Sequence, residues 1–155
     1  MTPAINLLKK QKITHSIHEY EHDPNRHDFG LEAAEALGLS VDEVFKTLLV
    51  TDGATYFVAI LPVNHKLNLK KVAAAVGVKK LQMAEPKDAE RITGYIVGGI
   101  SPIAQKKRLK TVLDISAKQF NKIYISGGRR GCDIGIHPDD LVQVLSATVA
   151  DVLDA

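Results

Sequence analysis

Residues 47–61 have the sequence TLLVTDGATYFVAIL, and this stretch decides the fold class of the chain. β-Branched and apolar side chains fill 47–51 and 54–61, which is the composition of buried strands. Asp52 and Gly53 separate the two runs, and this pair is the one that best fits a tight primed turn. The stretch therefore predicts a β-hairpin, the clearest one in the chain.

Short helices and further short strands surround this hairpin in the sequence. Ser40 and Glu43 form a capping-box pattern, which predicts a helix that ends near Lys46. Capping residues, apolar periodicity and glycine stops predict the other helices at 3–10, 31–37, 69–76, 87–92 and from Pro138 onward. Additional strands are expected at 14–21, 95–97, 111–115, 122–125 and 132–136, whereas 149–153 is ambiguous.

This order of elements indicates a mixed α/β fold. Short strands and short helices alternate without regular βαβ repetition, so we expect a largely antiparallel sheet flanked by helices. No internal repeat, linker or low-complexity tract is present, and the length of 155 residues suits one domain covering 1–155.

The composition favours a soluble, cytoplasmic protein. Its apolar stretches are far shorter than the ~20 residues that cross a bilayer, and no signal-peptide pattern opens the chain. Cys132 is the only cysteine, which excludes an internal disulfide and suits a reducing compartment. We therefore expect no association with a membrane.

The charge of the chain limits how it can contact nucleic acid. A formal net charge of +2 argues against coating long stretches through many phosphate contacts. Two local clusters could still hold a few phosphates, although an ordinary solvated surface is the favoured interpretation of the first. The clusters are Lys106, Lys107, Arg108 and Lys110, and Arg129 with Arg130.

Two glycine-containing loops are candidate binding elements. In 98–102, GGISP, two glycines allow close approach to the backbone, and the amides could grip a carbonyl or carboxylate. Such a donor is worth about 3 kcal/mol where charge develops on the oxygen, but a plain turn fits the pattern equally well. In 126–131, SGGRRG, glycines and guanidiniums could cradle a phosphate, or form a long hairpin turn with solvated arginines.

Lys46 stands where the expected helix passes into the first hairpin strand. Its charge would be partly withdrawn from water there, and it could anchor a phosphate, a ribose hydroxyl or an ester oxygen. The commoner interpretation is a cation placed favourably at a helix C-terminus.

Other familiar catalytic patterns are missing. The histidines near the N-terminus lack metal-ligand spacing, because residues such as His15 and His18 face opposite sides of a strand. Cys132 has no thiol-enzyme signature, and a lone cysteine is more often a small buried hydrophobe. We expect neither a metal site nor a cofactor. His137, before Pro138, is expected to be a polar group at a helix end.

Taken together, several short motifs resemble the YbaK family of aminoacyl-tRNA editing proteins over nearly the entire chain. The family includes the insertion domain of bacterial prolyl-tRNA synthetases. Each motif is weak alone, but their order and spacing are specific. The motifs are Tyr20, Phe29 in Asp28-Phe29-Gly30, Lys46-Thr47, Gly98 to Pro102, Ser126-Gly127-Gly128 and Ile136-His137-Pro138.

The resemblance implies a trans-acting deacylase that removes mischarged cysteine from tRNA(Pro), with tRNA(Cys) as a further substrate carrier. It also implies a curved sheet forming an open barrel-like core. Lys46 matches the essential lysine of the family. The implied substrate-binding residues are Tyr20, Phe29, Thr47, Gly98, Gly99, Ile100, Ser101, Pro102, Ser126 and Asp133, with Arg130 at the terminal adenosine or its phosphate.

No side chain is an obvious activated nucleophile, so we expect positioning and electrostatic stabilisation, with water or the substrate thiol as attacking group. The implied partners are the 3′ end of an aminoacylated tRNA and, transiently, prolyl-tRNA synthetase. Two alternatives stay open: a deacylase that prefers alanyl-tRNA(Pro), and a non-catalytic module that binds tRNA or a synthetase.

Overall fold

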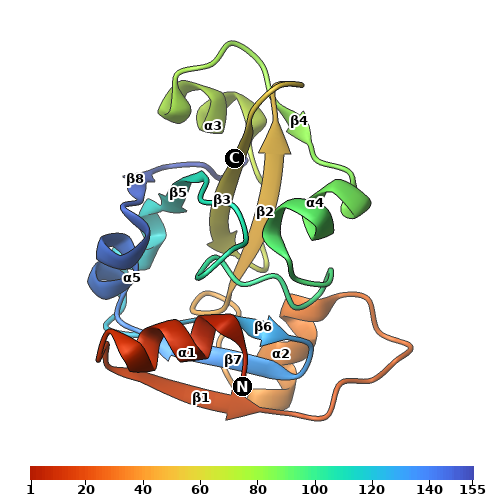
Figure 1. Ribbon diagram of the computed structural model, residues 1–155, viewed down its shortest axis with the longest axis vertical. Helices are drawn as coiled ribbons and strands as arrows, with labels where there is room; N and C mark the ends of the chain where they lie inside the picture. The colour runs from red at the N-terminus through yellow and green to blue at the C-terminus, as the bar shows by residue number, and fades with distance from the viewer.

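The strands of this protein form two sheets, which the computed structural model describes over all of residues 1–155 (Figure 1). The three-stranded sheet has the order β1-β7-β6, with bounds His15–Glu19, Cys132–Ile136 and Ile123–Arg129. The five-stranded sheet has the order β4-β2-β3-β5-β8, with bounds Gln82–Met83, Phe45–Thr51, Tyr56–Pro62, Lys110–Asp114 and Thr148–Ala150. The helices are α1 (Pro3–Lys10), α2 (Phe29–Leu37), α3 (Leu69–Val76), α4 (Pro86–Thr93), α5 (Pro138–Leu145) and the 3₁₀ helix η1 (Ile115–Gln119).

The mixed α/β class predicted from the sequence is confirmed. Strand pairs are mostly antiparallel, and only β3–β5 and β5–β8 are parallel. The expectation of one curved, barrel-like sheet is corrected, because the strands of the two sheets cross steeply (Figure 1). At such a crossing only one backbone pair comes within reach, the isolated bridge between Val44 and Tyr124.

The hairpin at the centre of the larger sheet runs from Phe45 to Pro62, in the register Thr51 opposite Tyr56. Its loop has four residues, 52–55, and is not the tight primed turn that Asp52 and Gly53 predict. The Asp52 carboxylate explains the longer loop, because its Oδ1 accepts hydrogen bonds from the amides of Ala54 (2.9 Å) and Thr55 (2.7 Å).

The helix expected to end at Lys46 does not form. Ser40 N–H does donate to Glu43 Oε2 (3.0 Å), as in a capping box, but 41–43 form only a turn. Glu43 and Val44 instead bond to other strands, because Tyr124 N–H donates to the Glu43 carbonyl and Val63 N–H donates to the Val44 carbonyl. Lys46 is therefore the second residue of β2 and not a helix-end cation.

The remaining helix predictions are confirmed within a few residues, and Gly38, Gly77 and Gly94 end α2, α3 and α4 in the left-handed conformation. The strand expected at 95–97 is wrong, because this segment turns back on itself and Gly99 N–H donates to the Ile96 carbonyl. The segment 126–129 belongs to β6 and carries a bulge, so the turn to β7 is short.

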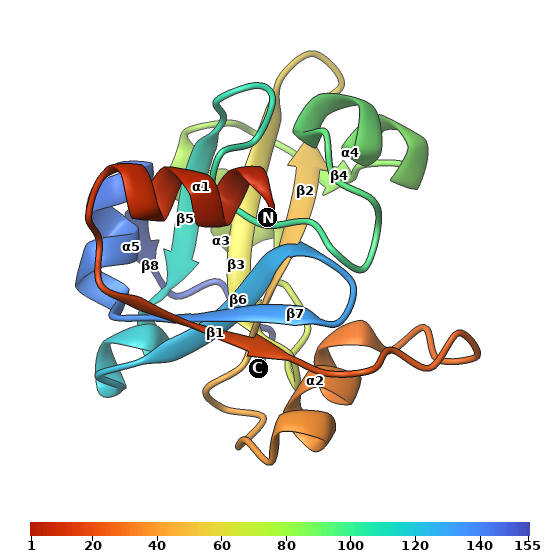
Figure 2. The same cartoon turned by 60° about the horizontal axis from the view of Figure 1, so that its bottom comes forward.

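The two largest apolar clusters hold the sheets together, and a third, of Ala33, Ala34, Val44 and Val63, packs α2 against the ends of the hairpin. The largest lies between the two sheets and under α1, and its fully buried members include Ile60, Leu113, Ile125 and Ile134. The second packs α3 against the other face of the hairpin through Val50, Leu61 and Val72. Figure 2 shows α4 and α2 on the same side of β2, one towards each end of the strand.

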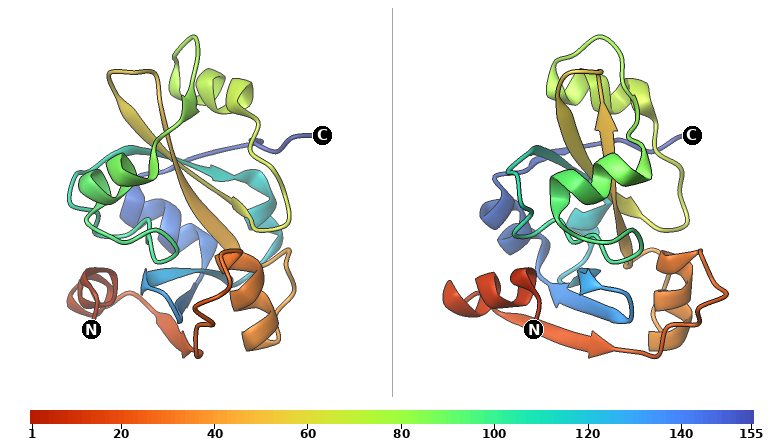
Figure 3. Two further views of the ribbon diagram at one scale, coloured as in Figure 1. Left: turned by 90° about the vertical axis from the view of Figure 1, so that its right-hand side faces the viewer. Right: turned by 45° about the vertical axis from the view of Figure 1, so that its right-hand side comes forward.

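The chain ends lie beside different sheets. Figure 3 shows the N-terminus next to the three-stranded sheet and the C-terminus beyond the five-stranded one. None of the helices combines the length and apolarity that a membrane crossing requires.

Candidate active site

A cavity of about 480 Å³ lies along the free edge of β2. The edge is free because β4 is only two residues long and pairs with Val50 and Thr51 alone. Beyond that pairing, the Leu49 carbonyl still accepts from Ala84 N–H (3.0 Å). Backbone groups alternate sides along a strand, so the N–H and C=O of Thr47 point to this same edge. The cavity thus has a stretch of unpaired backbone in its wall.

The predicted site residues converge on this cavity from five separate segments. The loop after β1, the start of α2, β2, the 97–100 loop and the β6–β7 hairpin all contribute. The predicted residues that line it are Tyr20, Phe29, Lys46, Thr47, Gly98, Ile100, Ser126 and Asp133.

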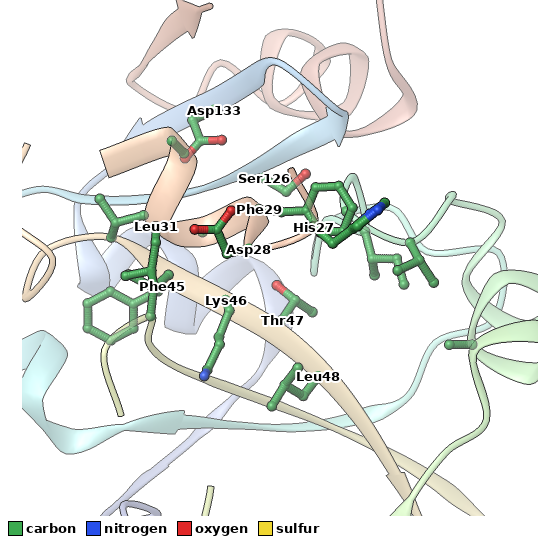
Figure 4. Close-up of a pocket in the computed structure, with 18 of the residues that line it drawn as sticks. His27, Asp28, Phe29, Leu31, Phe45, Lys46, Thr47, Leu48, Ser126 and Asp133 are labelled. Carbon is green, nitrogen blue, oxygen red and sulfur yellow. The ribbon is translucent and has the colours of Figure 1, made fainter. Parts of the chain in front are cut away.

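Lys46 and Thr47 leave β2 on opposite sides, and Thr47 points towards Ser126 and Phe29 (Figure 4). The cavity therefore wraps around the strand edge between them. Lys46 is half-buried, and burial lowers the pKa of its ammonium below the ordinary lysine value. No carboxylate lies within ion-pair distance, so the charge of Lys46 is available to a ligand.

The 98–102 turn is only partly open to the cavity. Gly98 and Ile100 line it, whereas Gly99, Ser101 and Pro102 are buried behind it. The Ser101 hydroxyl is used within the turn, where it accepts from Ile103 N–H (3.2 Å). Of the five residues expected to contact the substrate, two therefore line the cavity and three lie behind it.

The turn requires a glycine at Gly99, where a Cβ would lie 2.7 Å from the backbone of Arg129, and at Gly98. The φ of Gly98 is +91°, and a Cβ built there would lie 2.6 Å from Cε1 of Phe29. The Phe29 ring thus packs directly on the backbone of the turn, and the two together form one wall of the cavity.

A polar wall faces Thr47 across the cavity. Asp133 on β7 and Ser126 on β6 are direct partners in the antiparallel register. Asp133 is 6% exposed, and burial raises the pKa of its carboxyl to about 7. Burial, followed by the nearby charge of Asp133, raises the pKa of Tyr20 to about 12. The Thr47 hydroxyl is buried and has no hydrogen-bond partner in the chain.

Arg130 lies outside the cavity lining and braces its rim. Its guanidinium carbon sits 5.0 Å from the centroid of the Phe29 ring, and its Nε donates to the Val97 carbonyl (2.9 Å). Arg130 thereby connects the β6–β7 turn to the start of α2 through Phe29 and to the 97–100 loop through Val97.

A buried carboxylate that the sequence analysis did not single out holds the loop carrying Phe29. Glu32 is 3% exposed, its Oε1 lies 2.7 Å from His22 Nδ1, and its Oε2 accepts from Asp23 N–H (2.7 Å). The residues missed in the lining have no motif that could have identified them, except His27 and Asp28 beside Phe29. The others are apolar residues or glycine: Gly30, Leu31, Ala33, Val44, Phe45, Leu48, Leu49, Val63, Met83, Ala84, Pro86, Ala89 and Val97.

Comparison with known proteins places this arrangement in a family. The family model described as aminoacyl-tRNA editing domain matches residues 23–144. The chain belongs to the aminoacyl-tRNA editing domain family. The resemblance to YbaK-type proteins seen in the sequence is thereby confirmed.

Relatives of this editing domain occur as separate proteins and inside synthetases. A proposed Cys-tRNA(Pro)/Cys-tRNA(Cys) deacylase, EbsC of Enterococcus faecalis, is 36% identical over 152 residues, 97% of this chain and 92% of EbsC. The proline–tRNA ligase of Thermosipho melanesiensis is 30% identical over 112 residues, 72% of this chain but 19% of the ligase.

Solved structures share the whole fold of this editing domain. The hypothetical protein APE2540 superposes with a TM-score of 0.87 at 30% identity, covering 98% of this chain and 99% of that one. A proposed trans-editing enzyme for prolyl-tRNA synthetase superposes with a TM-score of 0.86 at 23% identity, covering 99% and 96%.

Proposed function

We propose that this protein is a trans-acting aminoacyl-tRNA deacylase that removes mischarged cysteine from tRNA(Pro) and from tRNA(Cys). The observation that carries the proposal is the meeting of Lys46, Thr47 and Gly98 around one cavity in an editing domain. Its volume of about 480 Å³ suits an aminoacyl group with part of the terminal nucleoside, and not a tRNA body. The similarity to EbsC supports cysteine as the amino acid.

Physical selectivity explains why such an activity is needed. A synthetase pocket shaped for proline rejects an amino acid of similar size by only ~1–3 kcal/mol for each missing methylene-sized contact. A second site must then act on the errors, and a cavity with a fixed polar wall and unpaired backbone is suited to bind the wrongly attached group.

The chemistry we propose depends on positioning and electrostatics. Lys46 holds the acceptor end of the tRNA through its unpaired ammonium. Backbone amides at the Gly98 turn and at the free edge of β2 stabilise the negative charge that develops on the ester carbonyl oxygen. In this proposal the side chains of the protein form no covalent bond with the substrate.

For cysteinyl-tRNA, the attacking group we propose is the substrate's own thiol. Its sulfur bonds to the ester carbonyl carbon, the bond from that carbon to the ribose oxygen breaks, and the thiol proton ends on the ribose oxygen. The products are a cyclic thiolactone and free tRNA. Attack by water at the same carbon gives cysteine instead, and trapping of the released product distinguishes the two routes.

A deacylation assay tests the activity. Purified protein is mixed with Cys-tRNA(Pro), Cys-tRNA(Cys), Ala-tRNA(Pro) and Pro-tRNA(Pro), and release of labelled amino acid is followed. We expect fast release of cysteine from both tRNAs and slow release of alanine and proline. Faster release of alanine than of cysteine would show that alanyl-tRNA(Pro) is the preferred substrate. No release from any tRNA would show that the protein is a non-catalytic binding module.

Lys46→Ala should reduce deacylation by about 100-fold or more, because loss of a preorganised charge removes roughly 3 kcal/mol of stabilisation. The circular dichroism spectrum should be unchanged, since the Lys46 side chain is bonded to nothing in the chain. Lys70→Ala on the exposed face of α3 is the matched control and should keep full activity. Wild-type turnover in well-folded Lys46→Ala protein would refute the role of this lysine.

We further propose that residues 1–155 act as one domain in the cytoplasm, with prolyl-tRNA synthetase as a transient partner. A net charge of +2 supports few phosphate contacts, so selection of one tRNA body needs help from another protein. Adding the synthetase to the assay should increase the preference for tRNA(Pro) over tRNA(Cys). An unchanged preference would show that the synthetase does not help this protein to select tRNA(Pro).

A further inference from the structure

The polar wall of the cavity holds groups that nothing within the chain satisfies. The carboxylate of Asp133 makes no hydrogen bond or ion pair and is 6% exposed. The Thr47 hydroxyl is buried without a partner. Buried polar groups in native proteins are almost always paired, so two unpaired ones facing the same cavity indicate a ligand.

These groups gather on one side of an otherwise mostly apolar cavity. Fourteen of the 23 lining residues are hydrophobic. Ser126 lies directly opposite Asp133 in the strand register, and Thr47 points towards both from β2 (Figure 4). A ligand that enters the cavity is therefore oriented by this wall, and its complement is a small group with several donor hydrogens.

We infer that Asp133, Ser126 and Thr47 form the subsite for the α-ammonium group of the aminoacyl ester, so that the protein selects substrates with a free amino group. The inference rests on the proposed function. An ammonium has three donors and no acceptor, and a carboxylate with two hydroxyls offers four acceptor oxygens. Of these, only the Ser126 oxygen already accepts a hydrogen bond, from Gly128 N–H (3.2 Å). The opposite charges also compensate each other where water is excluded.

This subsite would reject esters whose nitrogen is acylated. An N-acyl group removes the charge and two donors and adds bulk, while Asp133 stays buried without a partner. N-acetyl- and N-formyl-aminoacyl esters are thus excluded as a class, whatever their side chain. Tyr20, Lys46 and the 97–100 loop are left free to contact the side chain and the acceptor nucleotide.

The test uses a binding probe that cannot be cleaved. Cysteine is joined to 3′-amino-3′-deoxyadenosine through an amide, and the same compound is prepared with an N-acetyl group. Calorimetric titration at neutral pH compares wild-type protein, Asp133→Asn and Asp140→Asn. Asp140 lies in the first turn of α5, outside the cavity lining, and its replacement removes the same charge.

We expect wild-type and Asp140→Asn protein to bind the free amine roughly 10- to 100-fold more tightly than the N-acetyl compound, the range for a charge-assisted hydrogen bond. In Asp133→Asn this preference should fall towards equality. Ser126→Ala gives a second, milder test and should reduce the preference in part.

Equal affinities of the two compounds for wild-type protein would overturn the inference, and so would an undiminished preference in Asp133→Asn. The deacylation assay on the same preparations is read separately. Protein that prefers the free amine but releases no amino acid would sink the proposed activity and support the subsite. Protein that deacylates free and N-acetyl esters equally would support the proposed activity and overturn the subsite.

Discussion

Asp133 is a carboxyl group whose burial couples folding to pH. Its pKa in the folded chain is about 7, against about 3.9 for an unfolded aspartate. Between these values the unfolded chain has released the proton and the folded chain retains it, so the free energy of unfolding falls as pH rises from about 4 to about 7. Binding of a cationic ligand reverses this effect, because it favours the ionised carboxylate.

Asp133→Asn should therefore be more stable than wild type above about pH 7, by an amount on the order of a few kcal/mol, and equally stable near about pH 4. Urea denaturation at the two pH values measures this difference. A variant that is less stable at the higher pH would show that the carboxylate has a partner in the folded chain.

At Thr47, as at Asp133, a buried polar group that we propose binds the substrate lowers the stability of the folded chain. The buried Thr47 hydroxyl has no partner, so Thr47→Val removes a desolvated polar group at almost constant shape. We expect the free energy of unfolding to stay level or rise by about 1 kcal/mol, while deacylation falls. Thr47→Ser is the control, since it keeps the hydroxyl; lower stability in Thr47→Val would contradict the argument.

At the scale of elements, the cavity wall depends on the contact between the Gly98 turn and the start of α2. Gly98→Ala strains a residue with φ of +91° and drives its Cβ into the Phe29 ring. Gly53→Ala in the hairpin loop, with φ of +100° and no atom within 4 Å, has the backbone strain alone.

We expect Gly53→Ala to lose about 1 kcal/mol of stability from the backbone alone and to keep its activity. Gly98→Ala should lose about 1–3 kcal/mol more through steric overlap, and should lose most of its deacylation because Phe29 is displaced. Denaturant melts and the deacylation assay compare the pair. Equal stability of the two variants would mean that the ring moves away without cost.

At the scale of the whole molecule, charge predicts how the protein meets RNA. A net charge of +2 and two small basic clusters suit about two or three phosphate contacts. The logarithm of the affinity for tRNA should then fall against the logarithm of salt concentration with a slope of about −2. Titrations over a range of KCl concentrations measure the slope, and a value several-fold steeper would indicate a much larger RNA surface.

The sequence alone determined the elements whose causes are local. Thr2 and Pro3 start α1, Gly38 ends α2, and the apolar runs around Asp52 form a hairpin, because capping hydrogen bonds, backbone freedom and side-chain alternation act within a few residues. The family motifs also named Lys46, Thr47, Ser126 and Asp133 of the cavity wall, but they missed most of its apolar residues, which belong to no motif.

Tertiary structure decided what depends on distant partners. The capping-box pattern at Ser40 does not lead into a helix, because the carbonyls of Glu43 and Val44 accept hydrogen bonds from residues far along the chain. Only packing buried Ser101 and Pro102, isolated the carboxylate of Asp133 and placed Arg130 against Phe29. Burial and long-range hydrogen bonds depend on neighbours that are distant in the sequence, so a local pattern does not contain them. These neighbours set the chemistry of the cavity.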